Sequence, residues 1–303
     1  MTINWMNLPP EYAQKETSKF IVLPISYEKD LTFGTGAKNG PKEIIKASKQ
    51  LEYYDTQFEN EPFENGIFLN KTLELSENTP PQMVETVSKQ VKELTKENNK
   101  FLISLGGDHS VTIGIVKGLG VSNASPTSTT NQDFDIIQFD AHADLRDSWT
   151  SQLNHACVAK QLVKNHSILQ IGIRSQDVDE ANFVKQTKED NHENQVCQIQ
   201  AHEENKITLL KNHLKQLKHK IYLTIDIDVF DPSLFPSTGT PEPGGLFWQE
   251  IIKLIQIIFE EKQIIAADIV EFAPKENTPF QGQSYSLAKL TYKLMSMKNK
   301  FNK

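Results

Sequence analysis

Aspartate and histidine side chains recur at short spacing beyond apolar runs, and this pattern is the clearest source of chemistry in the sequence. The segment FDIIQFDAHADLRD places Asp140, His142 and Asp144 two residues apart. If the backbone stays extended there, all three side chains point to the same side. Two carboxylates and an imidazole that converge without a nearby lysine favour a cation between them. A capped turn would explain one aspartate but not three ligand-type residues, so this segment predicts a metal site.

A second pair of carboxylates follows another apolar run. In IYLTIDIDVFDPS, Asp226 and Asp228 again stand two residues apart, on one side of an expected strand end. Burying bare carboxylates there would cost free energy unless a cation paired with them. The Asp231-Pro232-Ser233 stretch that comes next is typical of a turn rather than of a site.

A histidine follows an earlier apolar run. In FLISLGGDHS, Gly106 and Gly107 permit a tight turn and close backbone approach, so that His109 can point into a cleft. A purely structural histidine is an equally good interpretation of this segment alone.

The three segments together supply aspartates and histidines but no thiolate. This donor set suits Mn²⁺ or a similar divalent ion better than a structural zinc. Such a set exceeds what one ion usually draws from a protein, which favours two ions bridged by a shared aspartate and a water. The candidate ligands are His109, Asp140, His142, Asp144, Asp226 and Asp228.

A glutamate follows a fourth apolar run, in IIAADIVEFAP. Glu271, at the end of an expected strand, could pair with a cationic group of a substrate. A carboxylate that pairs with a surface lysine is the alternative interpretation.

All four segments lie at or just beyond the carboxyl end of an expected strand, which is where open α/β sheets bind ligands. Short apolar runs alternate with longer helical patterns, which predicts an α/β fold with a mostly parallel sheet flanked by helices, in a single domain over residues 1–303. The expected strands are Phe20–Pro24, Phe101–Leu105, Phe134–Asp140, Ile168–Gly172, Ile221–Asp226 and Ile264–Ile269. The expected helices span 41–53, 81–97, 155–164, 204–219, 247–260 and 284–298.

Two polar segments interrupt this alternation. Residues 120–133 are small and polar, which predicts a surface loop. Residues 186–205 are charged and rich in amides, and we interpret them as a solvated excursion. No change of composition is large enough to mark a linker between domains.

The composition excludes several classes of protein. A formal net charge of −7 over 303 residues argues against a nucleic-acid partner, which would require a basic patch. Two cysteines, Cys157 and Cys197, cannot make a disulfide framework. The N-terminus lacks the pattern of a signal peptide, and no run approaches about 18 uninterrupted apolar residues. We therefore expect a cytoplasmic protein with no membrane partner.

The chemistry-bearing segments, taken in the order in which they occur along the chain, resemble the motifs of the ureohydrolase superfamily. This superfamily contains the arginases, the agmatinases and their relatives. VLPISYEKDLTFGTGAKNGPKEII, LEYYD and the forms DAHADLRD and TGTPEPGGL are similar to the agmatinase-like branch. The resemblance implies a three-layer α/β/α fold of the arginase/deacetylase type. The resemblance extends over nearly the whole chain. The matching stretches are GGDHS at 106–110, DAHADLRD at 140–147, NHAC at 154–157, DIDVFDPS at 226–233, GTPEPGGL at 239–246 and DIVEFAP at 268–274.

The resemblance also implies a metal centre with two Mn²⁺ ions and a bridging hydroxide, although the donors would accept other divalent ions. The hydroxide would attack the guanidinium carbon of a small guanidino substrate, expected to be agmatine, to give putrescine and urea. One ion would be held by His109, Asp140, Asp144 and Asp228, together with partners from the rest of the set. His142 and Asp226 would complete the six ligands, and shared aspartates would bridge the two ions.

Three side chains receive roles from the same resemblance. His155, in NHAC, matches the histidine proposed to contact the substrate and carry a proton to the leaving amine, a role that suits a near-neutral pKa. Glu271 resembles the glutamate that binds the guanidinium, and Asp144 could also orient the hydroxide. Because family members are commonly trimers or hexamers, we expect a homo-oligomer.

Some positions depart from the agmatinase pattern. Asn154 stands where serine is common, residues 275–283 differ, and the loop LRDSWTSQLN lacks the arginase form. Trp149 in that loop either narrows the tail pocket or packs on the surface. The alternatives are therefore the same chemistry on guanidinobutyrate, guanidinopropionate, guanidine or arginine, or on formimidoylglutamate. An inactive regulatory relative that binds metal would lack a ligand or the shuttle, and none is missing here.

Two arginines stand among the 32 basic residues, Arg146 and Arg174. Both follow expected strands at the edge that carries the candidate ligands. A planar guanidinium that holds a carboxylate or carbonyl groups cannot be replaced by lysine. We therefore expect both arginines to support the site, with chance retention as the alternative.

Overall fold

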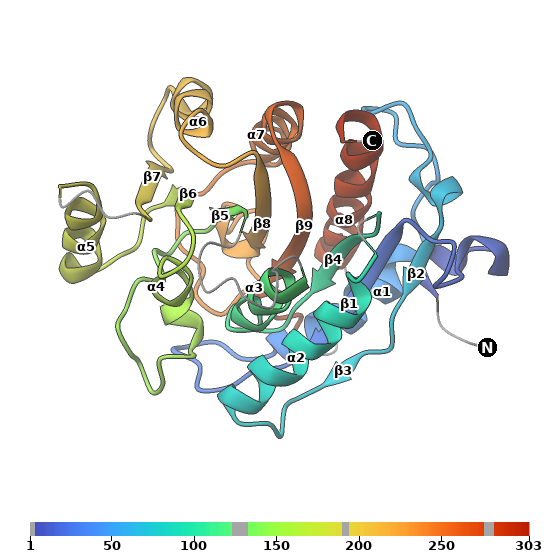
Figure 1. The fold of residues 1–303 in the computed structure, drawn as a ribbon, viewed down its shortest axis with the longest axis horizontal. Helices are drawn as coiled ribbons and strands as arrows, with labels where there is room; N and C mark the ends of the chain where they lie inside the picture. Colours follow the sequence, from blue (N-terminus) through green and yellow to red (C-terminus); the bar gives the residue numbers. More distant parts are fainter. Residues whose placement is uncertain (1–3, 98, 123–132, 190–193, 276–281, 303) are drawn as a thin grey trace.

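A parallel sheet runs through the centre of the molecule, and its strand order decides which loops meet (Figure 1). The computed structural model describes residues 4–97, 99–122, 133–189, 194–275 and 282–302. Within them the sheet has nine strands in the order β2-β1-β4-β9-β8-β5-β6-β7, with β3 beside β1, and all the pairs are parallel. The strands are β1 (Phe20–Ser26), β2 (Ile67–Leu69), β3 (Leu73–Glu74), β4 (Phe101–Leu105), β5 (Asp135–Phe139), β6 (Ile168–Ile173), β7 (Val196–Gln200), β8 (Lys220–Asp226) and β9 (Gln263–Val270).

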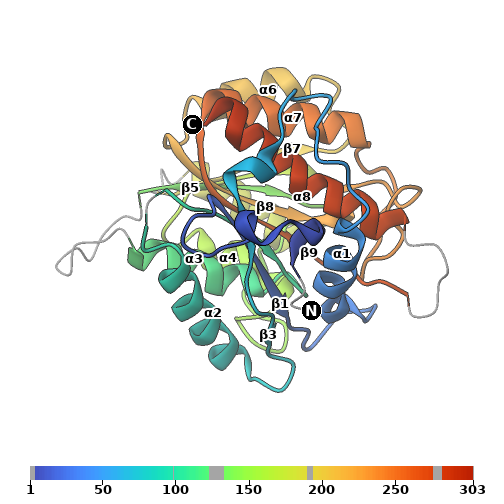
Figure 2. The ribbon, with the colours of Figure 1, turned by 90° about the vertical axis from the view of Figure 1, so that its right-hand side faces the viewer.

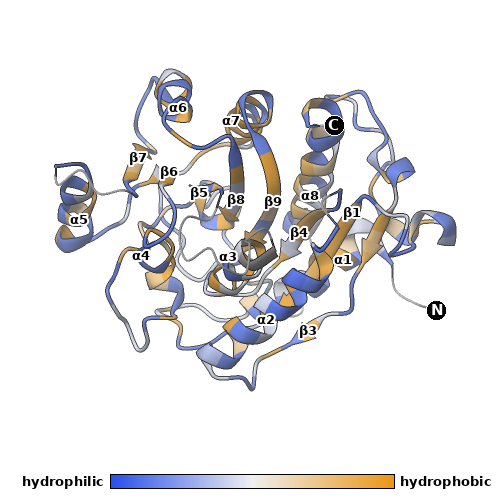
Figure 3. Cartoon of the chain, viewed as in Figure 1, coloured by the Kyte–Doolittle hydropathy of each residue, from blue (hydrophilic) through white to orange (hydrophobic). Residues whose placement is uncertain are grey.

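Helices cover both faces of the sheet, which makes three layers (Figure 2). Because both faces are covered, β4, β5 and β6 are buried at every residue, and the strands are largely apolar in Figure 3. The predicted three-layer α/β/α fold is confirmed. One face carries α1 (Gly40–Ser48), α6 (Lys206–Leu214), α7 (Trp248–Glu261) and α8 (Gly282–Phe301). The other carries α2 (Pro80–Leu94), α3 (Val111–Ser122), α4 (Val158–Leu162) and α5 (Val178–Glu189).

The expected strands and helices are all present, with shifted ends, but the sequence did not predict α3, α5, β7 or the short strands β2 and β3. Helix α3 contains Gly114 and Gly118, which weaken a helical pattern. The structure explains both, because a Cβ at Gly114 would lie 2.9 Å from that of Val87 in α2. Close packing of two helices therefore requires residues that disfavour the helix itself. Among the described residues, no helix combines the length and apolarity needed to cross a bilayer.

Our interpretation of residues 186–205 as a solvated excursion is wrong for much of the segment. Its first residues end α5, and Val196–Gln200 form β7, which pairs with β6 at one edge of the sheet. An edge strand is only partly covered, so it keeps the polar composition that suggested a loop. Of the predicted loop over 120–133, residues 123–132 lie outside the described residues, and Gly120–Ser122 belong to α3.

Four neighbouring strands, β4, β9, β8 and β5, bring the four chemistry-bearing segments to one edge of the sheet. Each of these strands is followed directly by one of the segments, and all run in the same direction. His109, Glu271, Asp226 and Asp140 therefore leave the sheet side by side, although they are far apart in the sequence. The placement expected from the sequence is confirmed.

The turn after β4 depends on a glycine. A Cβ at Gly107 would lie 1.8 Å from the carbonyl oxygen of Tyr27, which accepts the N–H of Asp108 at 3.0 Å. The close backbone approach predicted for this segment is confirmed, and it places His109 two residues later.

We expect Gly107→Ala to lower the free energy of unfolding by about 2 kcal/mol or more, because the added methyl group must displace backbone. Gly239→Ala is the matched control, because a Cβ there meets no atom closer than 3.7 Å. Urea denaturation of both variants and of the parent protein measures the effect. Equal stability of Gly107→Ala and the parent would contradict the close approach.

Candidate metal and substrate site

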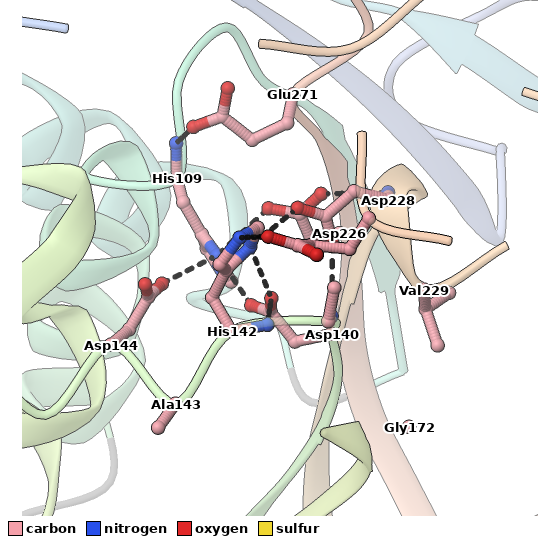
Figure 4. Close-up of polar contacts among 12 residues, drawn as sticks. His109, Asp140, His142, Ala143, Asp144, Gly172, Asp226, Asp228, Val229 and Glu271 are labelled. Atoms are coloured by element: carbon pink, nitrogen blue, oxygen red, sulfur yellow. Dashed lines mark hydrogen bonds and ion pairs between the residues drawn. The ribbon is translucent and has the colours of Figure 1, made fainter. Parts of the chain in front are cut away.

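One ring nitrogen of His109 faces a group of carboxylates (Figure 4). Its Nδ1 lies 3.1 Å from Oδ2 of Asp140, 3.2 Å from Oδ2 of Asp144 and 3.3 Å from Oδ2 of Asp226. This buried nitrogen nevertheless makes no hydrogen bond. Its other nitrogen, Nε2, lies 2.9 Å from Oγ1 of Thr224, which holds the ring in place. An imidazole nitrogen that faces three carboxylate oxygens at 3.1 to 3.3 Å and makes no hydrogen bond to them fits a bound cation.

A second group forms around His142. Its Nδ1 lies 2.8 Å from Oδ2 of Asp228 and 3.8 Å from Oδ1 of Asp140. Two sets of side chains could therefore each hold an ion, His109 with Asp140 and Asp144, and Asp140 with His142 and Asp228. Asp140 belongs to both sets and turns one oxygen toward each histidine. The geometry groups Asp228 with His142 and brings Asp226 to His109, which revises the partition implied by the family resemblance.

The carboxylates of the cluster are costly in their charged form. Burial, followed by the charge of Asp228, raises the pKa of Asp140 above its usual range. Burial and the charge of Asp140 raise the pKa of Asp144 to about 7, and burial and Asp228 raise that of Asp226 well above its usual value. Burial opposes ionisation of Asp228 too, but the charge and hydrogen bond of His142 leave its pKa lowered. A divalent cation would offset this repulsion, so the residues fit a metal.

The side chains converge by a route that the sequence did not predict. Strand β5 ends at Phe139, so Asp140, His142 and Asp144 do not continue an extended strand. Asp144 adopts a left-handed backbone with φ of 52°, which costs about 1 kcal/mol or more for a residue other than glycine. Asp228 lies in a 3₁₀ turn over Ile227–Val229, where its N–H donates to Oδ1 of Asp226 at 2.9 Å. Irregular backbone, rather than strand alternation, aims these ligands.

Glu271 also has a left-handed backbone, with φ of 64°. Its N–H donates to the carbonyl of Gly107 at 2.8 Å, and its Oε1 accepts the N–H of His109 at 2.7 Å. Burial, followed by the charge of Asp108, raises the pKa of Glu271 well above its usual value. A buried carboxyl of this kind becomes an anion readily only beside a cation.

His155 lies across the cavity in the turn before α4. Asn154 caps this turn by accepting the N–H of Ala156 at 3.0 Å, and its amide donates to the carbonyl of Asp30 at 3.0 Å. Asn154, which stands where serine is common, therefore ties the turn to the N-terminal loop. Nε2 of His155 lies 3.3 Å from Oγ1 of Thr32, and its buried Nδ1 has no hydrogen-bond partner. Burial, then the charges of His109 and His142, lower the pKa of His155 to about 4, so the ring is neutral near pH 7.

A cavity of about 340 Å³ opens above the cluster and is lined by His155 and Glu271. Trp149 lies in its wall, half exposed, with the guanidinium of Arg146 5.2 Å from the ring centroid. Sequence reasoning missed several other wall residues. Some of them directly follow β6, so the rule that ligands bind beyond strand ends could have found them. The missed residues are Leu31, Thr32, Phe33, Gly34, Ser175, Gln176, Asp177, Glu180, Gly239 and Thr240.

The two arginines hold backbone and carboxylate groups at this edge, as expected. Arg174 donates to the carbonyl groups of Asp228 at 2.6 Å and Glu242 at 2.8 Å, and so ties the turn after β8 to a later loop. Nη1 of Arg146 pairs with Oδ2 of Asp177 at 3.0 Å. Arg174 donates through Nε, Nη1 and Nη2, a planar arrangement of donors that lysine lacks.

A parallel α/β sheet with a buried His/Asp cluster at its carboxyl edge, in the wall of a cavity, is an arrangement typical of α/β enzymes that use bound cations. The family model described as Arginase family matches residues 18–296. The chain belongs to the arginase family of hydrolases.

Individual relatives agree with this family. The N(1)-aminopropylagmatine ureohydrolase of Synechocystis sp. is 33% identical over 284 residues, which cover 91% of this chain and 87% of that protein. The agmatinase of Pyrococcus horikoshii is 32% identical over 259 residues, which cover 83% of each protein. The crystal structure of agmatine ureohydrolase of Thermoplasma volcanium matches with a TM-score of 0.81 at 25% identity, over 99% of this chain and 96% of that chain.

We expect Arg174→Lys to lower the free energy of unfolding by about 2 kcal/mol, because an ammonium cannot reach both loops that the guanidinium joins. Thermal and urea denaturation measure the loss. Lys253→Arg on α7 serves as the control for a lysine–arginine exchange away from this edge. A stability of Arg174→Lys equal to that of the parent would show that the fork is dispensable.

Proposed function

We propose that this protein is a manganese-dependent amidinohydrolase that hydrolyses the guanidinium group of agmatine or of a closely related guanidino amine. The proposal depends mainly on one observation. Two groups of His and Asp side chains, each able to hold a metal ion, converge at a cavity that Glu271 and His155 also line. Membership of the arginase family supports it.

The proposed ligands are divided by their distances. His109, Asp144 and Asp226 would hold one ion, His142 and Asp228 the other, and Asp140 would face both. When bound, two Mn²⁺ ions lower the pKa of a water molecule and thereby supply a hydroxide nucleophile near neutral pH. A set of oxygen and imidazole donors without thiolate suits Mn²⁺ better than a structural zinc.

Glu271 is the proposed binding residue for the guanidinium. The N–H of His109 fixes its Oε1 at 2.7 Å, so the carboxylate is oriented before substrate arrives. A cationic substrate would favour the ionised form of this buried carboxyl. Resonance makes guanidinium a poor electrophile, so orientation of its carbon is a large part of what the site must supply.

His155 is the proposed proton carrier. Its buried Nδ1 makes no hydrogen bond within the protein, so the ring can take the proton released by the attacking water and pass it to the leaving amine. Burial and the charges of His109 and His142 hold the pKa of this ring at about 4, which is below the near-neutral range expected for the role. Asp144 would orient the nucleophile. Urea and an amine are the products expected from this reaction.

N(1)-aminopropylagmatine is the second candidate substrate, because four of the relatives bear the name of its ureohydrolase at 30 to 33% identity. Phe33 and Trp149 line the cavity and are also exposed to solvent, so a longer amine tail could extend past them. Both candidates share the guanidinium end and differ in the tail.

The test is product release by the Mn²⁺-loaded protein across a panel of substrates. We expect agmatine or N(1)-aminopropylagmatine to have the highest kcat/KM for urea release. The comparison substrates are guanidinobutyrate, guanidinopropionate, guanidine, arginine and formimidoylglutamate, the last followed by its disappearance. No turnover of any of them by metal-loaded protein would overturn the proposal and favour an inactive metal-binding relative.

The roles of His155 and Asp228 predict opposite outcomes for two variants. His155→Ala should lower kcat by about 10² to 10⁴ while the manganese content is unchanged, because the ring moves a proton and holds no metal. Asp228→Asn should lose at least one ion. Elemental analysis together with steady-state kinetics separates the two. Full metal content with normal turnover in Asp228→Asn would contradict its assignment as a ligand.

A further inference from the structure

Three glutamines lie side by side on neighbouring strands next to the His/Asp cluster. Gln138 of β5 is the register partner of Gln170 of β6, which in turn is the register partner of Gln198 of β7. Register partners point to the same face of a sheet, and neighbouring strands lie about 4.8 Å apart. The three side chains therefore form one row.

The amides of this row are joined head to tail. Gln198 donates through Nε2 to Oε1 of Gln170 at 2.9 Å, and Gln170 donates through Nε2 to Oε1 of Gln138 at 2.9 Å. Gln138 donates through Nε2 to Oδ2 of Asp140 at 2.7 Å. A carboxylate only accepts hydrogen bonds, so it determines the direction of each amide in the row. We call these three residues the glutamine row.

The row is buried, which makes its presence informative. Gln138 is 2% exposed and Gln170 is fully buried, in strands that are otherwise largely apolar. Each buried amide costs free energy unless all of its polar atoms find partners, and apolar residues at both positions would avoid that cost. Packing alone therefore does not account for the row.

The row ends at Asp140, the residue that belongs to both sets of candidate metal ligands. Oδ2 of Asp140 accepts from Gln138 and lies 3.1 Å from Nδ1 of His109. Oδ1 of Asp140 accepts the N–H of His142 at 2.7 Å. A hydrogen bond to each oxygen fixes the plane of the carboxylate, and Gln170 also donates to the carbonyl of Ala143 at 2.6 Å, within the ligand loop.

We propose that Gln138 and Gln170, oriented by Gln198, are positioning residues that set the plane of the Asp140 carboxylate for metal binding. The inference rests on the proposed metal centre. Without the row, the carboxylate gains rotational freedom that metal binding must then remove. Partners of this kind typically contribute 10- to 100-fold to metal affinity.

The experiment compares Mn²⁺ affinity in a series of variants by isothermal titration calorimetry, with Mn²⁺ electron paramagnetic resonance as a second readout of the coordination. We expect Gln138→Met to weaken Mn²⁺ binding by about 10- to 100-fold, with smaller losses for Gln170→Met and then Gln198→Met. This decline with distance from Asp140 is the signature of a row that acts through one carboxylate. Gln138→His should retain most of the affinity, because a ring N–H can replace the amide donor.

Gln256→Met on α7 is the control for a glutamine outside the row, because its amide donates to Glu260 on the same helix. A metal-free thermal transition measures folding of each variant separately. Should Gln138→Met fail to fold, Gln170→Met, one strand further from the metal, decides by the same criterion.

A folded Gln138→Met with Mn²⁺ affinity within twofold of the parent overturns the inference, whatever the parent's activity. Failure of the parent itself to bind Mn²⁺ overturns the proposed metal centre and the role of the row with it. The two failures are therefore distinguishable.

Discussion

The repulsion among buried carboxylates at one edge of the sheet is the constraint on which the rest of this structure depends. Burial and mutual charge raise the pKa of Asp140, Asp144 and Asp226, so ionisation of all three is unfavourable unless a cation lies among them. A fold that brings them together must hold them against that repulsion. Much of the backbone and many of the polar side chains around the cluster hold the carboxylates in place.

Support for the cluster comes from strained and tightly bonded positions. Asp144 and Glu271 themselves have a left-handed backbone, which turns their side chains into the site, and Arg174 donates to the carbonyl of Asp228 within the turn after β8. The glutamine row reaches Asp140 from the other side. Conformations that cost free energy persist only where neighbouring contacts determine them. The turn of Gly107 beneath Tyr27 belongs to the same set of constraints.

The site divides into a cluster that carries the chemistry and a wall that would meet the substrate tail. The cluster comes from the ends of central strands, within the range that matches the arginase family. The wall comes from the N-terminal loop, the loop before α4 and the residues after β6, including Thr32, Trp149 and Gln176. Loops vary more readily than strands, so relatives that share the chemistry can differ in substrate.

The sequence by itself determined the strand-and-helix alternation, the identity of the candidate ligands and their position beyond strand ends, because apolar runs and Asp/His spacing are local features. It could not show that Asp226 approaches His109 while Asp228 approaches His142, since left-handed and 3₁₀ backbone follow from contacts made elsewhere in the chain. The sequence shows one glutamine in each of the expected strands that correspond to β5 and β6, but it did not predict β7, which carries Gln198. The three glutamines form a row only because of the order and register of their strands. The tertiary structure alone decides order and register, because the hydrogen bonds between strands join residues that are distant in sequence.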